Sequence, residues 1–259
     1  EKPGIKPFSF NPFSFASNPE KGKQLRFLLD EINKFSEDNS VAGLIIDLGK
    51  VRSGFAKKEE IYNALTSFKE TGKKIIVYAK NGIGNTDYYL ISMADEIYTH
   101  RMSSITLRGL SMEPMFIRGL LDTISIVPEI IRVSPYKTAA DMLLNRKMSV
   151  EMEENYSELL EDLSEIRIND ISLAKNWDIS KTKSIIDGGP YLSSIRAIES
   201  ELINGVMFPD EFDEYIKDLE EEEEINITKW NKYEHSGKYV NDWKPKEKPK
   251  VAVIYAVGG

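Results

Sequence analysis

The chain has 259 residues, of which 41% are hydrophobic, and a formal net charge of −8 at pH 7. That length suits one large domain or two smaller ones with a substantial hydrophobic core. The acidic balance provides no basic face for phosphates, so we expect no nucleic-acid partner. The absence of cysteine excludes disulfides, thiolate metal sites and a cysteine nucleophile. The chain has two histidines, His100 and His235, and neither has ligand spacing around it, so we expect no metal or cofactor and no Ser-His-Asp triad.

Helices and strands alternate through the first part of the chain. The four prolines of residues 1–24 indicate an irregular approach segment. After it, apolar periodicity and short apolar runs such as VAGLIIDL (41–48) distinguish helices from buried strands. They predict helices over residues 24–35, 57–71 and 86–94, and strands over residues 41–48, 74–78 and 96–99.

The second part of the chain is mostly helical. The pattern predicts helices over residues 115–121, 149–174, 181–186 and 191–201, and a strand over residues 130–133. Ser149 has the residue type of an N-cap, and Glu151 and Glu153 suit the first turn of the long helix that follows it. This alternation predicts an α/β fold with a largely parallel sheet and a long helical excursion.

Composition divides the chain into four parts. We expect an approach segment (1–24), a main domain (25–205) whose helical part is 149–205, an acidic and polar connection (206–248), and a strand (249–259) that opens a second, truncated domain. No stretch reaches the roughly 20 apolar residues that a membrane span needs. The first residue is Glu1, so we expect the chain to come from a longer protein and an upstream anchor to be missing.

Four segments in this order resemble a known family: residues 41–81, 84–100, 130–149 and the terminal VAVIYAVGG. They are similar to the amino-terminal half of the long form of signal peptide peptidase A, in the Ser/Lys peptidase family that shares the Clp protease/crotonase fold. The resemblance implies a tandem duplication of a unit built from repeated β-β-α elements. It also implies that chemistry is divided between the two copies.

The same resemblance assigns roles to individual residues. The family's general-base lysine, from a Tyr-Lys-Ser/Thr-Ala motif, corresponds to Lys137 in the sequence Tyr136-Lys137-Thr138-Ala139. Asn85 occupies the position of the serine nucleophile, and an amide cannot attack a carbonyl. The glycine pair of the oxyanion hole appears only as Ser53-Gly54. The resemblance therefore implies a base without a nucleophile, the serine lying in a carboxy-terminal half beyond Gly259.

A lysine base needs a pKa well below its usual value of about 10.4, which burial of the amine provides. The uncharged neighbours Pro135, Ala139 and Ala140 suit that demand, and the hydroxyls of Ser134 and Thr138 could hold the amine. If the resemblance holds, Tyr88, Tyr89, Leu107 and Leu110 are expected to line a hydrophobic substrate groove.

The main hypothesis is half of a serine endopeptidase that degrades cleaved signal peptides or other extended apolar peptides. The resemblance further implies a tetrameric homo-oligomer, anchored in a membrane and facing the periplasm or cell exterior. One alternative is a non-catalytic assembly or binding module with the same fold. Another is a true crotonase acting on acyl-CoA thioesters, which needs paired backbone donors and usually a carboxylate; neither is clear in this sequence.

Overall fold

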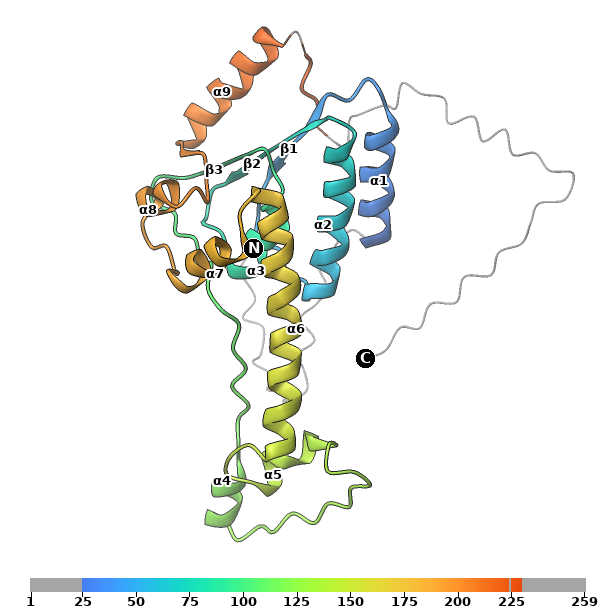
Figure 1. The fold of residues 1–259 in the computed structure, drawn as a ribbon, viewed down its shortest axis with the longest axis vertical. Coiled ribbons are helices and arrows are strands. Elements are labelled where there is room, and N and C mark those ends of the chain that lie inside the picture. Colours follow the sequence, from blue (N-terminus) through green and yellow to red (C-terminus); the bar gives the residue numbers. More distant parts are fainter. Residues whose placement is uncertain (1–24, 224, 230–259) are drawn as a thin grey trace, which may run out of the picture.

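The computed structural model describes residues 25–223 and 225–229. The predicted approach segment (1–24) and the predicted strand of a second domain (249–259) both lie outside the described residues. Figure 1 shows a sheet with helices packed around it and an elongated part that extends away from the sheet.

The first part of the chain alternates helices and strands as predicted. Its elements are α1 (Leu25–Glu37), β1 (Gly43–Asp47), α2 (Phe55–Glu70), β2 (Lys74–Ala79), α3 (Asn85–Ile91) and β3 (Glu96–Thr99). The strands form a four-stranded, all-parallel sheet in the order β1-β2-β3-β4, with Gly43 opposite Lys74 and Ile76 opposite Glu96. The α/β fold with a parallel sheet and a long helix is confirmed.

The second part contains the long helix and several short elements. These are α4 (Arg118–Thr123), the 3-10 helix η1 (Thr138–Ala140), α5 (Asp141–Leu144), α6 (Val150–Lys175), α7 (Ile179–Asp187), α8 (Ser194–Glu199), β4 (Gly205–Val206) and α9 (Pro209–Glu222). Ser149 is the N-cap of α6, as predicted, and its hydroxyl accepts a hydrogen bond from the backbone N–H of Met152.

The core lies on both faces of strand β2. Successive side chains of a strand point to opposite faces. Ile75, Val77 and Ala79 join the large core that includes α1, α2 and α3. Ile76 and Tyr78 face the other way, into a smaller core. This two-sided burial explains why β2 reads in the sequence as a continuous apolar run.

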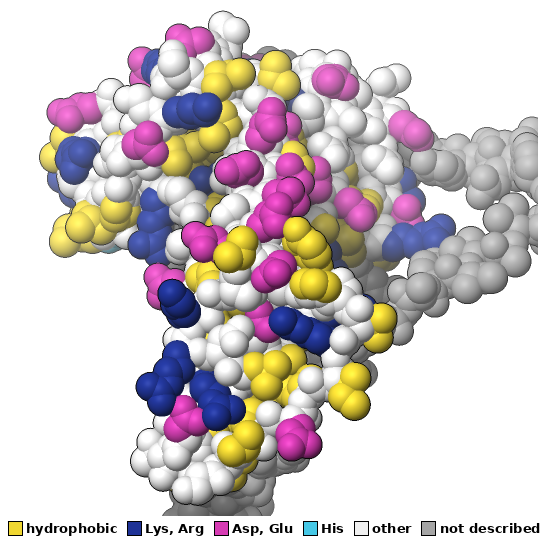
Figure 2. Space-filling model, turned by 60° about the horizontal axis from the view of Figure 1, so that its bottom comes forward, with side chains coloured by type: hydrophobic (Ala, Val, Ile, Leu, Met, Phe, Trp, Pro, Cys, Tyr) yellow, Lys and Arg dark blue, Asp and Glu magenta, His cyan; other side chains and the backbone are white. Residues whose placement is uncertain are grey.

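Residues 108–166, here called the arm, leave the domain between β3 and the second half of α6. Figure 1 shows α4 and α5 at the far end of the arm from the sheet. Within the arm, Asp141 and Met152 are the two buried residues. Large hydrophobic side chains are exposed along it, among them Met115, Leu120, Ile124 and Val127. Figure 2 shows hydrophobic side chains at the surface among Lys and Arg in the lower half of the view.

The predicted strand over residues 130–133 is wrong. This segment has no regular secondary structure, and Ile131 and Val133 are 101% and 92% exposed. An apolar run becomes a strand only where another strand can pair with its backbone, and none of the strands in the described part of the chain pairs with this segment. The predicted helix over residues 115–121 forms later, as α4.

The folded unit extends beyond residue 205, because the predicted connection 206–248 begins with α9, which packs on the sheet. Phe212 is buried, and its ring stacks on Tyr78 with centroids 4.3 Å apart. Tyr215, Ile216 and Leu219 join the same small core. The acidic residues of α9 concealed this apolar face in the sequence.

We expect Phe212→Ala to lower the free energy of unfolding by about 3 kcal/mol, because a large buried ring is removed from the small core. The exposed Lys217 on the same helix provides the control, since Lys217→Ala should change it by less than about 0.5 kcal/mol. Urea denaturation followed by circular dichroism measures both. Equal effects would mean that α9 does not belong to the folded unit.

Candidate active site

The two motifs that by resemblance occupy the family's nucleophile and oxyanion positions, without keeping its residues there, lie at neighbouring helix starts. Gly54 is the N-cap of α2, and Asn85 is the first residue of α3. Each helix follows a strand of the parallel sheet, so both begin at the carboxyl edge of the sheet, where α/β folds bind ligands. The rings of Phe55 and Tyr89 stack with centroids 5.0 Å apart and hold the two helices together.

A buried lysine that the sequence reasoning missed bridges these helices. Lys58 is 3% exposed. Its Nζ lies 2.6 Å from the hydroxyl oxygen of Thr86 and 2.6 Å from the Asp87 carboxylate. The arrangement contains an amine beside a hydroxyl, but the same amine is held in an ion pair with the Asp87 carboxylate on α3. Lys58 and Asp87 therefore join α2 to α3 rather than form a base and its nucleophile.

Asn85 has a structural role in this chain. Its amide oxygen accepts hydrogen bonds from the backbone N–H of Arg108 at 3.0 Å and from Nη1 of Arg167 at 2.9 Å. Its amide nitrogen donates to the carbonyl of Gly109 at 3.4 Å. A serine hydroxyl has enough donor and acceptor sites for three contacts, but they share one oxygen on a shorter side chain, whereas Asn85 has a separate oxygen and nitrogen to reach Arg108, Arg167 and Gly109. The side chain at the nucleophile position is thus engaged with the segment that leaves β3.

The predicted walls of a substrate groove are mostly core residues. Tyr88, Tyr89 and Leu107 are fully buried, so this prediction is wrong for them. The Tyr88 hydroxyl donates to the carbonyl of Leu202 at 3.1 Å, and the Tyr89 hydroxyl donates to Asp170 at 2.9 Å. Aromatic residues at the start of a helix do not reveal in the sequence whether they face a groove or the core.

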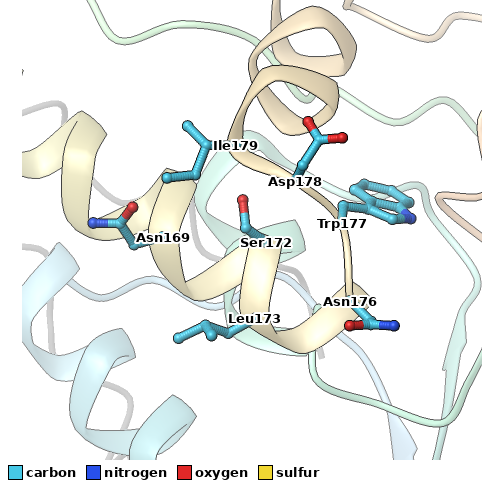
Figure 3. A pocket seen from close by; sticks show the side chains of 7 residues that line it. All are labelled: Asn169, Ser172, Leu173, Asn176, Trp177, Asp178 and Ile179. Atoms are coloured by element: carbon cyan, nitrogen blue, oxygen red, sulfur yellow. The ribbon is translucent and has the colours of Figure 1, made fainter.

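A surface pocket of about 520 Å³ lies instead where α6 ends and α7 begins. Figure 3 shows the side chains that line it: Asn169, Ser172, Leu173, Asn176, Trp177, Asp178 and Ile179. Its one carboxylate, that of Asp178, accepts a hydrogen bond from the backbone N–H of Lys181 and caps α7. The pocket contains neither Lys137 nor Asn85 and is at the opposite end of α6 from the arm's loop.

Lys137 lies in the arm, away from the helix starts of α2 and α3. It directly precedes η1, its backbone N–H donates to the carbonyl of Ser134 at 3.1 Å, and its side chain is exposed. The Ser134 hydroxyl accepts a hydrogen bond from the backbone N–H of Tyr136 at 3.3 Å. The structure does not bring Lys137 and Asn85 together, and the burial expected around the amine is absent from the described part of the chain.

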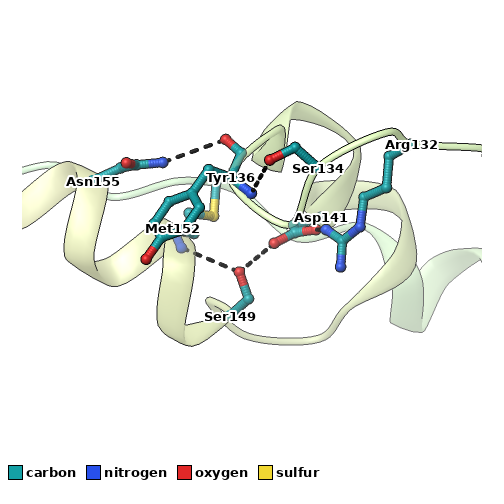
Figure 4. A network of polar contacts seen from close by, with 7 residues as sticks. All are labelled: Arg132, Ser134, Tyr136, Asp141, Ser149, Met152 and Asn155. Atoms are coloured by element: carbon teal, nitrogen blue, oxygen red, sulfur yellow. Dashed lines mark hydrogen bonds and ion pairs between the residues drawn. The ribbon is translucent and has the colours of Figure 1, made fainter.

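The loop that carries Lys137 is fixed on both sides, as Figure 4 shows. Before it, Asn155 on α6 donates to the carbonyl of Tyr136 at 3.4 Å. After it, the fully buried Asp141 accepts a hydrogen bond from Arg132 at 2.8 Å and a short one from the hydroxyl of Ser149. Asp141 thereby ties the loop to the start of α6.

The lysine with the most perturbed pKa is elsewhere. Burial lowers the pKa of Lys175, at the end of α6, from 10.5 to about 8, with the nearby Lys69 adding to this effect while Asp95 and Glu201 oppose it. This lysine has no motif around it, so the sequence gave no signal for it. Among the described residues, no hydroxyl forms a hydrogen bond with its amine.

Two further findings concern metal binding and membrane spans in the described residues. Among residues 25–223 and 225–229, no group of three or more His, Asp or Glu side chains is placed to hold a metal ion. No helix within these ranges is long and apolar enough to cross a membrane.

Comparison with known proteins gives the class of this fold and then its family. The parallel sheet with a long helix is consistent with the ClpP/crotonase-like fold. The family model described as "Peptidase family S49" matches residues 67–226, more than half of the chain. The chain therefore belongs to peptidase family S49, whose members are serine peptidases.

Three relatives illustrate the similarity. Protease 4 of Haemophilus influenzae is 31% identical over 65% of this chain and 27% of its own length. The chloroplastic serine protease SPPA of Arabidopsis thaliana is 26% identical over 82% of this chain and 32% of its own length. An SppA protein of Enterococcus faecium, named as a candidate signal peptide peptidase, is 22% identical over 71% of this chain and 52% of its own. The chain thus spans about a third or less of the first two relatives.

We expect Asp87→Ala to destabilise the fold by about 3 kcal/mol, because it leaves the buried Lys58 amine without its counter-charge. The double variant Lys58→Met/Asp87→Ala should recover most of that loss, since the unpaired charge is then gone. Urea denaturation measures both. As a control, Asp47→Ala breaks an exposed ion pair with Lys80 and should cost less than about 1 kcal/mol. An Asp87→Ala loss no larger than that of the control would contradict the bridging role of Lys58.

A second prediction concerns Lys175. Because its pKa is about 8 in the fold, against 10.5 ordinarily, the unfolded chain holds this proton between those pH values while the folded chain has released it. Stability then rises with pH across that window. We expect this contribution to disappear in Lys175→Met, seen as a change in the parent-minus-variant unfolding free energy between pH 8 and 10.5. A constant difference would refute the buried amine, and Lys183→Met at an exposed position is the control.

Proposed function

We propose that this chain is the amino-terminal half of a serine endopeptidase with a Ser/Lys dyad, and that Lys137 is the general base. The serine comes from a carboxy-terminal half that follows Gly259. The observation that carries the proposal is that the nucleophile position and the proposed base lie in different parts of this chain. Asn85 fills the nucleophile position in the domain, while Lys137 lies exposed on the anchored loop of the arm, open to a hydroxyl from outside this unit.

The chemistry follows from that arrangement. The neutral amine of Lys137 takes the proton of the serine hydroxyl as the oxygen attacks the peptide carbonyl, and the protonated amine then gives that proton to the leaving nitrogen. Water, deprotonated in the same way, hydrolyses the acyl-enzyme. A lysine must be neutral to act as a base, and burial of a lysine amine favours the neutral form. The exposed Ile131, Val133 and Tyr136 near Lys137 supply apolar surface that a covering partner would bury together with the amine.

The proposed substrates are cleaved signal peptides or other extended apolar peptides. Membership of peptidase family S49 and the names of the relatives support this choice. An extended apolar peptide can add to a sheet edge as a strand, with backbone hydrogen bonds for affinity and apolar pockets for alternate side chains.

We also propose that the chain works as a homo-oligomer, a tetramer by resemblance, and that an upstream anchor holds it at a membrane facing the periplasm or cell exterior. The exposed apolar side chains of the arm support assembly, because isolated soluble proteins rarely expose so many along one segment. They equally suit contact with the carboxy-terminal half. The anchor and the compartment rest on the family resemblance.

One alternative has an observation in its favour. In a non-catalytic assembly or binding module, Lys137 would be an ordinary surface lysine, and the arm would serve only to join subunits. The exposure of Lys137 fits this alternative as well as the peptidase. A measurement of peptidase activity therefore distinguishes the two functions.

The test uses the full-length protein, with its carboxy-terminal half, and a fluorogenic apolar peptide. We expect Lys137→Ala to lower kcat about 1000-fold, in the range of a lost general base. Lys147→Ala removes an exposed lysine from the same arm and should leave kcat near that of the parent. The 259-residue chain alone should show no turnover. Activity of this chain by itself, or parent-like kcat in Lys137→Ala, would overturn the proposed division of roles.

A further inference from the structure

The chain leaves the domain after Leu107 (the outgoing leg of the arm) and returns along α6 (the returning leg), and both legs meet the domain at one polar cluster around the buried Arg167. On the outgoing leg, Leu107 is the last buried residue before Asp141. On the returning leg, α6 has no buried residue between Met152 and Arg167. The arm therefore meets the domain at Arg108 and at Arg167, and these two residues are in direct contact.

That contact is made by a guanidinium with no ion-pair partner among the described residues. Arg167 is 1% exposed. Its Nη1 donates to the amide oxygen of Asn85 at 2.9 Å, and its Nη2 donates to the carbonyl of Arg108 at 2.8 Å. Its Nε is buried without a hydrogen-bond partner, and burial lowers the pKa of Arg167. Burying a cation among neutral acceptors is unfavourable, so stability alone does not explain this residue.

Geometry does explain it. A guanidinium is planar and directs its N–H groups in a fixed fork. Here Nη1 of Arg167 binds α3 through Asn85, and Nη2 binds the outgoing leg through the carbonyl of Arg108. Arg167 itself is part of α6. Asn85 closes the cluster by accepting the backbone N–H of Arg108 at 3.0 Å. Three segments are thus fixed relative to one another at the point where the arm begins.

The length of the arm makes its direction sensitive to small changes at this point. The start of α6 at Val150 lies 17 residues from Arg167, about 26 Å along the helix. A tilt of about 10° at the root would move the far end by roughly 4 Å. A general base must come within about 3.2 Å of the proton it takes. A base at the far end of the arm therefore requires a rigid connection between the arm and the domain.

We propose that Asn85 and Arg167 are positioning residues that fix the direction of the arm and, through it, the place of Lys137. In this half the position of the lost nucleophile has become the anchor of the arm that carries the base. The part of this inference that concerns catalysis rests on the proposed function, whereas the part that concerns the arm does not.

The arm can be tested on the 259-residue chain, which has no native cysteine. Spin labels at Glu60→Cys on α2 and Val133→Cys in the arm report the arm-to-domain distance. Labels at Glu60→Cys and Leu192→Cys, both on the domain surface, report the fold. Dilution with unlabelled chain removes distances between molecules. We expect Arg167→Met and Asn85→Ala to broaden the arm-to-domain distribution by about 4 Å and to leave the distance within the domain unchanged.

Two conservative variants separate geometry from charge. Asn85→Asp keeps the acceptor for Arg167 and for Arg108 and gives up only the long 3.4 Å contact with the Gly109 carbonyl, so the narrow distribution should be retained. Arg167→Lys keeps a cation but not the fork, so the distribution should broaden. An unchanged width in Arg167→Met and Asn85→Ala would overturn the proposal. If Arg167→Met changes the distance between the two labels within the domain, that variant is misfolded. The test then rests on Asn85→Ala, which removes only a partly exposed amide.

In the full-length protein, the same Arg167→Met change should lower kcat by about 100-fold, as expected when a catalytic group is misplaced by an ångström or more, with little change in KM. A broadened arm with parent-like kcat would count against Lys137 as the base and leave the anchor intact. A parent-like arm would count against the anchor, whatever the activity.

Discussion

The burial of strand β2 on both faces is the constraint on which the rest of the structure depends. Because Ile75 and Val77 face one core while Ile76 and Tyr78 face the other, helices must cover both sides of the sheet. The sheet is parallel, so the helices that follow β1 and β2 begin at the same edge. That edge brings the starts of α2 and α3 together at the side of the sheet where α/β folds bind ligands.

The polar groups at that edge are used for structure. Lys58 and Asp87 join α2 to α3, and Asn85 engages the arm through Arg108 and Arg167. A catalytic site would keep a hydroxyl free beside a neutral base. Membership of peptidase family S49 is compatible with this use of the edge if, as proposed above, the base is Lys137 on the arm and the scaffold is the domain.

Sequence patterns predicted the sheet well and the arm poorly. Strand β3 formed over the predicted residues, and the N-cap at Ser149 was identified by its residue type and the long helix after it. Both depend on local signals. The run at 130–133 has the composition of a strand but no neighbour to pair with, and α9 hid its apolar face behind acidic residues. Whether such a segment is covered depends on distant parts of the chain.

The sequence by itself determined the fold class, the family resemblance and the residue types at the two key positions, Lys137 and Asn85. These follow from periodicity and from motifs of a few adjacent residues. Only the tertiary structure decided that Lys137 is exposed on an arm and that Arg167 is buried against Asn85. Arg167 and Asn85 are 82 residues apart, and no local pattern encodes a contact at that separation. The physical reason is that burial and hydrogen-bond partners are properties of the packed chain, whereas periodicity belongs to each segment alone.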